Sequence, residues 1–313
     1  MATVKRIQFH QYGGPDVMRL EDFEPARPGK GQLLVRVRAA AANPMDWKIR
    51  NGEMKLMTGR NFPRGLGHDF AGIVEAVGPG VTRLRIGDAV LGAASIKAAG
   101  AFAEVVVADE KAVVTKPADL SYEQAAALPI VGLAALQALT DKGKLQPGQA
   151  VFIHGCLGGV GRAAAQLATL RGASVAGSCR STATHDANDL GIAPIVEFDF
   201  EPTPLRGRFD IVFDTAGTLP LKTARTLLRP GGHIIDINPT PAKLARGALP
   251  GPYQVLMAKA NPADLEELAR AAGRGKLQLP IGRSVPLTEA IEALTALETN
   301  HTPKGGKLII TTE

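Results

Sequence analysis

The chain has 313 residues, 45% of them hydrophobic and 21% charged, a length that suits two domains and a composition that excludes a disordered protein. Its net charge of +6 is spread thinly, and with 10 Phe, 3 Tyr and 1 Trp it lacks the interleaved basic and aromatic side chains of a single-strand nucleic-acid binder. Two cysteines exclude a zinc ribbon or a disulfide framework, and the longest apolar run, residues 125–136, is too short to cross a bilayer. We therefore expect a soluble, cytoplasmic protein that binds neither nucleic acid nor membrane.

Residues 4–117 consist of short β-strand patterns separated by Gly and Pro. Residues 33–39 alternate at period two, and residues 72–77 end at a Gly-Pro-Gly turn. Further strands are expected at 88–91 and 103–107. Several short strands with turn signals between them predict a partly open β-barrel.

At Ser121 the pattern changes to alternating strands and helices. Ser121 and Gln124 have the spacing of a capping box, which predicts that a helix begins there. The expected strands are 151–154, 174–178, 194–198, 209–213, 233–237 and 253–257, and the expected helices are 160–171 and 221–228. These strands are mostly apolar, as is typical of a parallel sheet covered by helices on both faces.

The last part of the chain is too small to form a domain by itself. Asn261 and Pro262 predict the N-cap and first residue of a helix, a second helix is expected at 287–297, and a strand at 307–310. We therefore expect these elements to pack back onto the first β domain.

A glycine-rich turn joins the strand expected at 151–154 to the helix that follows it. The turn ends with Gly158, Gly159, Val160 and Gly161. Gly158 would let the backbone approach a pyrophosphate, Gly161 would let the helix pack on the strand, and the helix N-terminus would attract negative charge. We interpret these four residues as a dinucleotide-binding site rather than a merely structural turn.

The residues after the next strand favour NADPH over NADH. An NAD site commonly has Asp or Glu about 20 residues after the last glycine. Here Arg180 stands in that region, with Ser178 two positions before it and Ser181 directly after it. A guanidinium and hydroxyl groups could bind the 2′-phosphate of NADPH, whereas a carboxylate would repel it. The alternative is that Arg180 is an ordinary solvated residue. Asn238, directly after the strand expected at 233–237, is also included among the cofactor-binding residues.

Several spaced motifs carry a resemblance to a known family. They are Asn43-Pro-Met-Asp46, Gly67-His-Asp-Phe-Ala-Gly72, Gly87-Asp88 and Gly158-Gly-Val-Gly161. Together they resemble the medium-chain dehydrogenase/reductase superfamily, and in particular its zinc-independent quinone oxidoreductase (zeta-crystallin-like) branch. The resemblance implies an α/β fold: a GroES-like partly open β-barrel catalytic domain of residues 1–122 and 260–313, and a Rossmann domain of residues 123–259 with a doubly wound parallel sheet. It also implies NADPH in the cleft between them and a homodimer joined through the two Rossmann sheets.

The resemblance also bears on metal binding. Relatives with catalytic zinc have Cys where Asn43 stands, His at the position of His68, and often a second Cys near residues 129–130. Only the His is present here. Because catalytic zinc needs three protein ligands, we expect no metal site, and we expect His68 to be a hydrogen-bonded residue beside the cleft.

Three further residues have a functional and a structural interpretation. Asn43 matches an Asn that lies near the nicotinamide in similar proteins, and it could hydrogen-bond a substrate carbonyl. Trp47 stands where many relatives have Tyr, and its indole could line a pocket for a planar acceptor or simply pack in the core. Cys156, at a helix N-terminus, could have a lowered pKa, although a structural role is favoured. The i, i+4 spacing of Asp46 and Arg50 predicts an ion pair.

These observations predict an NADPH-dependent oxidoreductase that delivers hydride to a small-molecule quinone or to the β-carbon of an activated enone or enal. One alternative is an enoyl-thioester or carbonyl reductase of the same superfamily. The other is a non-catalytic NADPH-binding sensor or structural protein.

Overall fold

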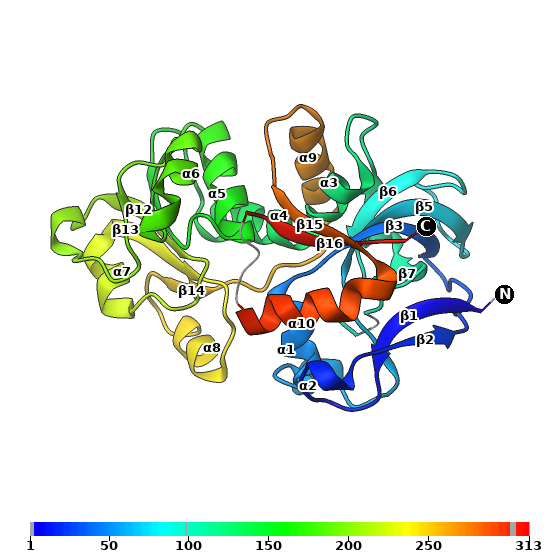
Figure 1. Cartoon of the computed structure of the whole chain (residues 1–313). Coiled ribbons are helices and arrows are strands. Elements are labelled where there is room, and N and C mark those ends of the chain that lie inside the picture. The colour runs from blue at the N-terminus through cyan, green and yellow to red at the C-terminus, as the bar shows by residue number, and fades with distance from the viewer. Residues whose placement is uncertain (1–2, 98, 301–304, 313) are drawn as a thin grey trace. The chain divides into compact units, whose positions relative to one another are not determined.

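The computed structural model describes residues 3–97, 99–300 and 305–312, and its chain divides into two compact units (Figure 1). Unit 1 comprises Met1–Ile130 and Ala260–Glu313, and unit 2 comprises Val131–Lys259. The first division lies later than the boundary expected after residue 122, because helix α3 (Tyr122–Ala126) packs against strands of unit 1. The second division falls after residue 259.

Unit 1 is built on two β-sheets. A 7-stranded sheet has the order β15-β16-β3-β5-β6-β8, with β7 paired to β3, and a 3-stranded sheet has the order β2-β1-β4. The strands are β1 (Val4–Phe9), β2 (Arg19–Phe23), β3 (Gln32–Ala41), β4 (Arg64–Gly65), β5 (Asp69–Val77), β6 (Ala89–Ala93), β7 (Val105–Asp109), β8 (Val113–Thr115), β15 (Ile281–Pro286) and β16 (Lys307–Thr311). The late strand β16 thus lies between β15 and the early strand β3. The expectation that the end of the chain packs on the first β domain is confirmed.

Two helix starts in unit 1 follow the predicted capping signals. Ser121 Oγ accepts a hydrogen bond from the Gln124 N–H at 3.2 Å, and the Gln124 side chain accepts one from the Ser121 N–H at 3.0 Å. Asn261 caps α9 (Pro262–Gly273), since its side chain accepts a hydrogen bond from the Ala263 N–H. Both predictions are confirmed.

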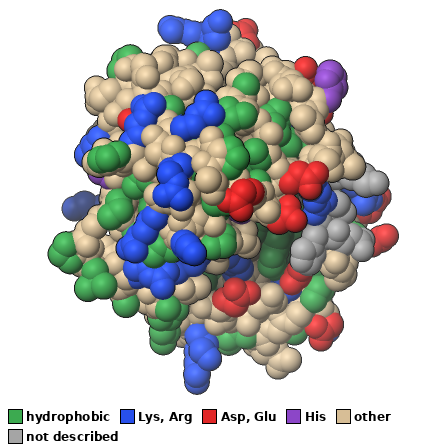
Figure 2. Space-filling view, turned by 90° about the vertical axis from the view of Figure 1, so that its left-hand side faces the viewer, with side chains coloured by type: hydrophobic (Ala, Val, Ile, Leu, Met, Phe, Trp, Pro, Cys, Tyr) green, Lys and Arg blue, Asp and Glu red, His purple; other side chains and the backbone are tan. Residues whose placement is uncertain are grey.

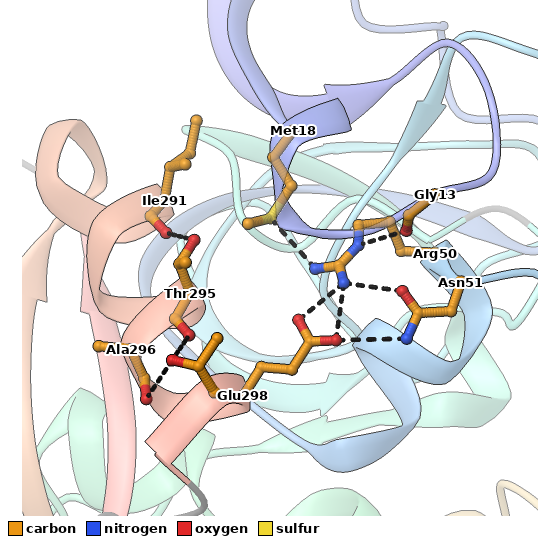
Figure 3. Close-up of polar contacts among 9 residues, drawn as sticks. Gly13, Met18, Arg50, Asn51, Ile291, Thr295, Ala296 and Glu298 are labelled. Carbon is orange, nitrogen blue, oxygen red and sulfur yellow. Dashed lines mark hydrogen bonds and ion pairs between the residues drawn. The ribbon is translucent and has the colours of Figure 1, made fainter.

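The predicted ion pair between Asp46 and Arg50 is wrong. Arg50, on α1 (Pro44–Arg50), is 1% exposed, and its Nη2 lies 2.9 and 2.7 Å from the two carboxylate oxygens of Glu298 on α10 (Ala290–Asn300) (Figure 3). Its Nε donates to the Gly13 carbonyl oxygen at 3.1 Å. Arg50 therefore ties α1 to α10 and to the loop after β1, while the Asp46 carboxylate is used elsewhere.

Unit 2 is a parallel sheet covered by helices. Its 6-stranded order is β11-β10-β9-β12-β13-β14, so the strands stand third, second, first, fourth, fifth and sixth in chain order. The strands are β9 (Ala150–His154), β10 (Ser174–Ser178), β11 (Ile195–Val196), β12 (Phe209–Asp214), β13 (Leu228–Asp236) and β14 (Tyr253–Val255). This is the doubly wound order of a Rossmann domain, in which ligands bind where the order reverses, at the carboxyl ends of the strands. The helices include α4 (Pro129–Gln137), α5 (Gly159–Leu170), α6 (Thr184–Asp189), α7 (Leu221–Leu227) and α8 (Pro241–Gly247).

The composition led us to expect thinly spread charge and no membrane-spanning helix, and the structure bears on both expectations. On the face drawn in Figure 2, Lys and Arg side chains form small groups interspersed with hydrophobic and acidic side chains. Among the described residues, no helix is both long enough and apolar enough to span a membrane.

Candidate functional site

The glycine-rich turn of unit 2 connects the end of β9 to the start of α5. Gly155 has a φ of +82°, a left-handed conformation that favours glycine. The N–H groups of Gly155 and Cys156 donate to the Ser178 carbonyl oxygen on β10 at 3.1 and 3.0 Å, so the turn is held against the neighbouring strand. A Cβ added to Gly161 would overlap the Gly155 carbonyl oxygen. Helix α5 can therefore lie this close to the turn only with glycine at position 161.

Gly158 is different, because the chain's own packing does not require a glycine there. It is exposed, its φ of −68° and ψ of 167° are open to any residue, and an added Cβ would meet no atom nearer than the Gly155 carbonyl oxygen at 3.4 Å. Gly158 is also the N-cap of α5, whose first N–H groups, those of Gly159 and Val160, carry partial positive charge. The turn leaves open the space and the donors that a pyrophosphate group uses.

A cavity of about 310 Å³ lies at the carboxyl ends of β10 and β11. Its lining residues follow these two strands directly, and they are Cys179, Arg180, Ser181, Thr182, Glu197, Phe198 and Asp199. Two of the predicted residues, Arg180 and Ser181, therefore lie together in one cavity. Sequence reasoning missed the two carboxylates: Glu197 fell inside the strand expected at 194–198, which ends at Val196 in the structure, and only Asp199 followed the expected strand.

The predicted cofactor residue Ser178 has another role. It is fully buried, and its Oγ lies 2.8 Å from His154 Nδ1 and accepts a hydrogen bond from the Gly155 N–H at 3.2 Å. The hydroxyl is thus engaged inside the sheet instead of lining the cavity. His154 Nε2 lies 3.1 Å from Thr218 Oγ1, and burial lowers the pKa of this His. The His154 ring therefore links β10, the glycine-rich turn and the loop after β12.

Acidic side chains at the ends of β12 and β13 hold the neighbouring loops. Asp214 is buried and accepts hydrogen bonds from N–H groups of residues 217–219, while burial raises its pKa. Asp236 accepts a hydrogen bond from the Asn238 N–H at 2.7 Å and pairs with Lys243 at 2.7 Å. The predicted residue Asn238 is half-buried at the carboxyl end of the parallel sheet. It lies at the edge where a Rossmann domain binds its ligand.

Cys156 is a structural residue. Its side chain is buried, and burial raises the pKa of its thiol to about 12, with Cys179 as a second cause. The helix N-terminus therefore does not give this chain a reactive thiolate, because the cost of burying the charge is the larger effect.

In unit 1, the residues that carried the family resemblance form a buried hydrogen-bond network. His68 Nδ1 lies 2.7 Å from one carboxylate oxygen of Asp46, and the other accepts the Asn43 N–H at 2.7 Å. The expectation that His68 is hydrogen-bonded is confirmed. Its Nε2 is buried and has no hydrogen-bond partner among the described residues.

The same network continues to a second carboxylate and a lysine. The Asn43 amide donates to Asp69 at 2.9 Å and to the Ala41 carbonyl oxygen at 3.3 Å, and it accepts a hydrogen bond from Lys307 Nζ at 2.6 Å. Burial raises the pKa of Asp69 to about 7, although Lys307 opposes the shift, and burial lowers the pKa of Lys307. Asp69 stood within the motif that carried the family resemblance but was given no role, and sequence reasoning missed the contact of Lys307, because nothing in the local pattern places β16 beside Asn43.

The described residues of the polar network lack the ligand set of a catalytic zinc site. No three His, Cys, Asp or Glu side chains in the described part of the chain come together as a metal ion requires. Asn43 replaces a thiolate with a neutral amide, and the Lys307 ammonium group lies against that amide oxygen, where it would repel a metal cation. Trp47, on the same helix as Asp46, is half-buried.

Two family models match the chain. Residues 29–118 match the alcohol dehydrogenase GroES-like domain, and residues 195–310 match the zinc-binding dehydrogenase family. Over 97% of both chains, the sequence is 30% identical to the chloroplast envelope quinone oxidoreductase homolog of Arabidopsis thaliana. It is 31% identical to the 2-methylene-furan-3-one reductase of Solanum lycopersicum, over 99% of this chain and 79% of that one.

A solved structure agrees with these similarities over the full length. The quinone oxidoreductase from Coxiella burnetii has a TM-score of 0.89 and 33% identity, and the match covers 100% of both chains. The expected combination of a GroES-like domain and a Rossmann domain is confirmed, and the family binds a nicotinamide dinucleotide. The chain is an oxidoreductase that belongs to the quinone oxidoreductase branch of the medium-chain dehydrogenase/reductase superfamily.

Proposed function

We propose that this chain is a zinc-independent, NADPH-dependent reductase that transfers hydride to a quinone or to an activated enone or enal. The observation that carries the proposal is Gly158, a glycine at the N-cap of α5 where the chain's own packing would accept a larger residue. Only a bound group would require a glycine at this position. A cavity that holds Arg180 and Ser181 at the end of the next strand also supports a dinucleotide site.

The residues of unit 2 act by binding and orienting the cofactor. The N–H groups of Gly159 and Val160 donate to the pyrophosphate, Gly161 keeps α5 close to the turn, and Asn238 contacts the cofactor at the end of β13. When bound, NADPH supplies the hydride. The protein supplies position and polarisation of the acceptor.

Arg180 and Ser181 give the preference for NADPH. Both are exposed in the cavity, and a guanidinium offers several donors to a 2′-phosphate that NADH lacks. One charge-assisted bond contributes about 1.5–3 kcal/mol, so Arg180→Glu should weaken NADPH binding by about 10- to 100-fold and leave NADH binding within about threefold. Arg206→Glu, an exposed residue outside this cavity, is the control. Equal losses for both cofactors would remove Arg180 from the phosphate site.

Asn43 and Trp47 of unit 1 bind the acceptor. Both Asn43 amide hydrogens are engaged, so its donation to a substrate carbonyl replaces the longer bond, that to the Ala41 carbonyl oxygen at 3.3 Å. The half-buried indole of Trp47 offers a flat apolar surface to a planar acceptor. No metal takes part, and the Lys307 ammonium group beside Asn43 contributes the local positive charge.

The proposal is tested by measuring NADPH oxidation across a panel of a quinone, an enone, an enal, an enoyl thioester and a simple aldehyde. Turnover with the quinone or with the enone and enal supports the proposed reaction, and the similarity to a furanone reductase makes the enone arm essential. Turnover only with the thioester or the aldehyde identifies the alternative reductase class. Tight NADPH binding without turnover on any acceptor identifies a sensor instead. Metal analysis of the purified protein should find no stoichiometric zinc.

A homodimer and a cytoplasmic location complete the proposal. Strand β14 is an edge of the 6-stranded sheet, and Leu244 and Leu249 near it are 43% and 67% exposed. A second copy pairing at this edge would cover them. Sedimentation of the wild type should give a dimer, and Leu249→Asp should shift it toward the monomer.

A further inference from the structure

The cavity at the ends of β10 and β11 holds more negative than positive side chains. Among the described residues, Arg180 is the only cation that lines it, whereas Glu197 and Asp199 both carry carboxylates. All three side chains are exposed. Within the described part of the chain, none of them has a hydrogen-bond or ion-pair partner. Their charges are therefore available to whatever enters the cavity.

The sheet geometry explains why residues 17 positions apart share this cavity. Strands β10 and β11 are parallel neighbours, with Ser178 opposite Val196, and the Cys179 N–H donates to the Val196 carbonyl oxygen at 3.0 Å. The two segments that follow these strands consequently leave the sheet side by side. Phe198 packs edge-on against the buried His154 ring, at 5.0 Å between ring centroids, which anchors the segment that carries both carboxylates.

We propose that Glu197 and Asp199 oppose the 2′-phosphate that Arg180 attracts, and so limit the preference of this chain for NADPH over NADH; the inference rests on the proposed function. A 2′-phosphate brings about 1.5 to 2 negative charges into the cavity, and the carboxylates repel them. NADH has a hydroxyl at that position, so the same carboxylates do not penalise it. One cation in the cavity therefore raises the affinity for NADPH, and two carboxylates reduce that gain in affinity.

The test isolates the adenosine end of the cofactor. Adenosine 2′,5′-bisphosphate and 5′-AMP differ only in the 2′-phosphate, and their dissociation constants are measured by calorimetry, together with those of NADPH and NADH. The variants are Glu197→Gln, Asp199→Asn and the double variant. Glu201→Gln is the control, an exposed carboxylate in the same segment that does not line the cavity. Thermal unfolding checks that all variants fold alike.

In low salt we expect the double variant to bind the bisphosphate and NADPH about 3- to 10-fold more tightly, with 5′-AMP and NADH changed by less than about twofold. The gain should shrink at high salt, because screening acts on exposed charges. An unchanged affinity of the double variant for the bisphosphate overturns the inference. An equal gain in affinity for 5′-AMP also overturns it, because the carboxylates would then act on the part of the adenosine that both probes have in common. If the wild type binds NADPH and NADH but the variants bind them with unchanged affinity, the inference fails and the proposed function still stands. Binding of neither cofactor by any variant overturns both.

Discussion

The buried network of unit 1 and the glycine-rich turn of unit 2 differ in what their polar groups bind. In unit 1, Asn43, Asp46, Asp69 and Lys307 are bound to one another and to nearby backbone, and all are buried. In unit 2, Gly158 at the start of α5 and Arg180 in the cavity are exposed. A substitution of Asp46, Asp69 or Lys307 in the network should therefore change mainly the free energy of unfolding, whereas a substitution of the exposed Gly158 or Arg180 should change mainly ligand binding.

The largest expected effect comes from removing the cation of the network. Lys307→Met removes the ammonium group that donates to the Asn43 amide oxygen and the Ala42 carbonyl oxygen and that opposes the raised pKa of Asp69, and breaking a buried charged network on one side costs about 3–5 kcal/mol of unfolding free energy. Denaturant unfolding measures the loss, and Lys276→Met, at an exposed position of the same unit, should cost less than about 0.5 kcal/mol. Adding Asp69→Asn should recover part of the stability. A Lys307→Met protein as stable as the wild type would contradict the comparison.

The next effect separates two glycines of one turn. Gly161→Ala forces a Cβ into the Gly155 carbonyl oxygen and should lower the unfolding free energy by about 1–3 kcal/mol. Gly158→Ala should leave stability within about 0.5 kcal/mol, because its Cβ meets nothing nearer than 3.4 Å, yet weaken NADPH binding at least tenfold. Unfolding and calorimetric titration of the two variants give both quantities. If both variants lose only stability, the turn is structural and Gly158 has no ligand.

Local sequence patterns predict one part of the fold and of the candidate site, and contacts between distant segments determine the rest. The glycine motif and the alternation of apolar strands with helices are local patterns, so they indicated the Rossmann unit and the strand-turn-helix correctly, and the role of Arg180 in cofactor binding stays a prediction. The contacts that the sequence missed join distant segments. Lys307 reaches Asn43 across 264 positions only because β16 lies beside β3. Glu197 joins Arg180 only because β11 pairs with β10.

Local spacing also misled where a side chain had a stronger partner. Asp46 and Arg50 are one helical turn apart, but Asp46 lies in the first turn of α1, where its carboxylate binds the Asn43 N–H and His68. Arg50 is left to bind Glu298, a residue of the distant helix α10. Ser178 was expected at a phosphate, but its hydroxyl bonds to His154 on the neighbouring strand. Neither the partner of Arg50 nor the partner of Ser178 can be predicted from sequence spacing alone.

A smaller effect is expected in the pH dependence of the unfolding free energy, which reports the ionisation of Asp69 in the network. Asp69 has a pKa of about 7 in the folded chain against its ordinary value of 3.8, so the folded state binds its proton more tightly. Between these pH values this group lowers stability as the pH rises, by at most about 1.4 kcal/mol per pH unit. Unfolding of the wild type and Asp69→Asn at pH 4.5, 5.5 and 6.5 should show the variant gaining relative stability with rising pH. Parallel pH profiles would mean that Asp69 is ionised throughout this range.

The smallest effect is expected at the cysteines. Both thiols are buried, and burial raises the pKa of each, so a thiol-alkylating reagent at pH 7.5 should modify neither in the native protein. Mass spectrometry before and after denaturation gives the count. Rapid labelling of Cys156 in the native state would show that the turn opens and exposes this buried thiol.

The position of β16 has a consequence for the order in which the protein is made. On the ribosome, unit 2 is complete once residue 259 has been synthesised, whereas unit 1 waits for a strand that begins at Lys307. Until that strand enters between β15 and β3, the earlier part of unit 1 exposes the edge of β3 at residues 39–41 and lacks the Lys307 charge that opposes the raised pKa of Asp69. The nascent GroES-like half should therefore be the part that needs protection from aggregation until β16 has been synthesised.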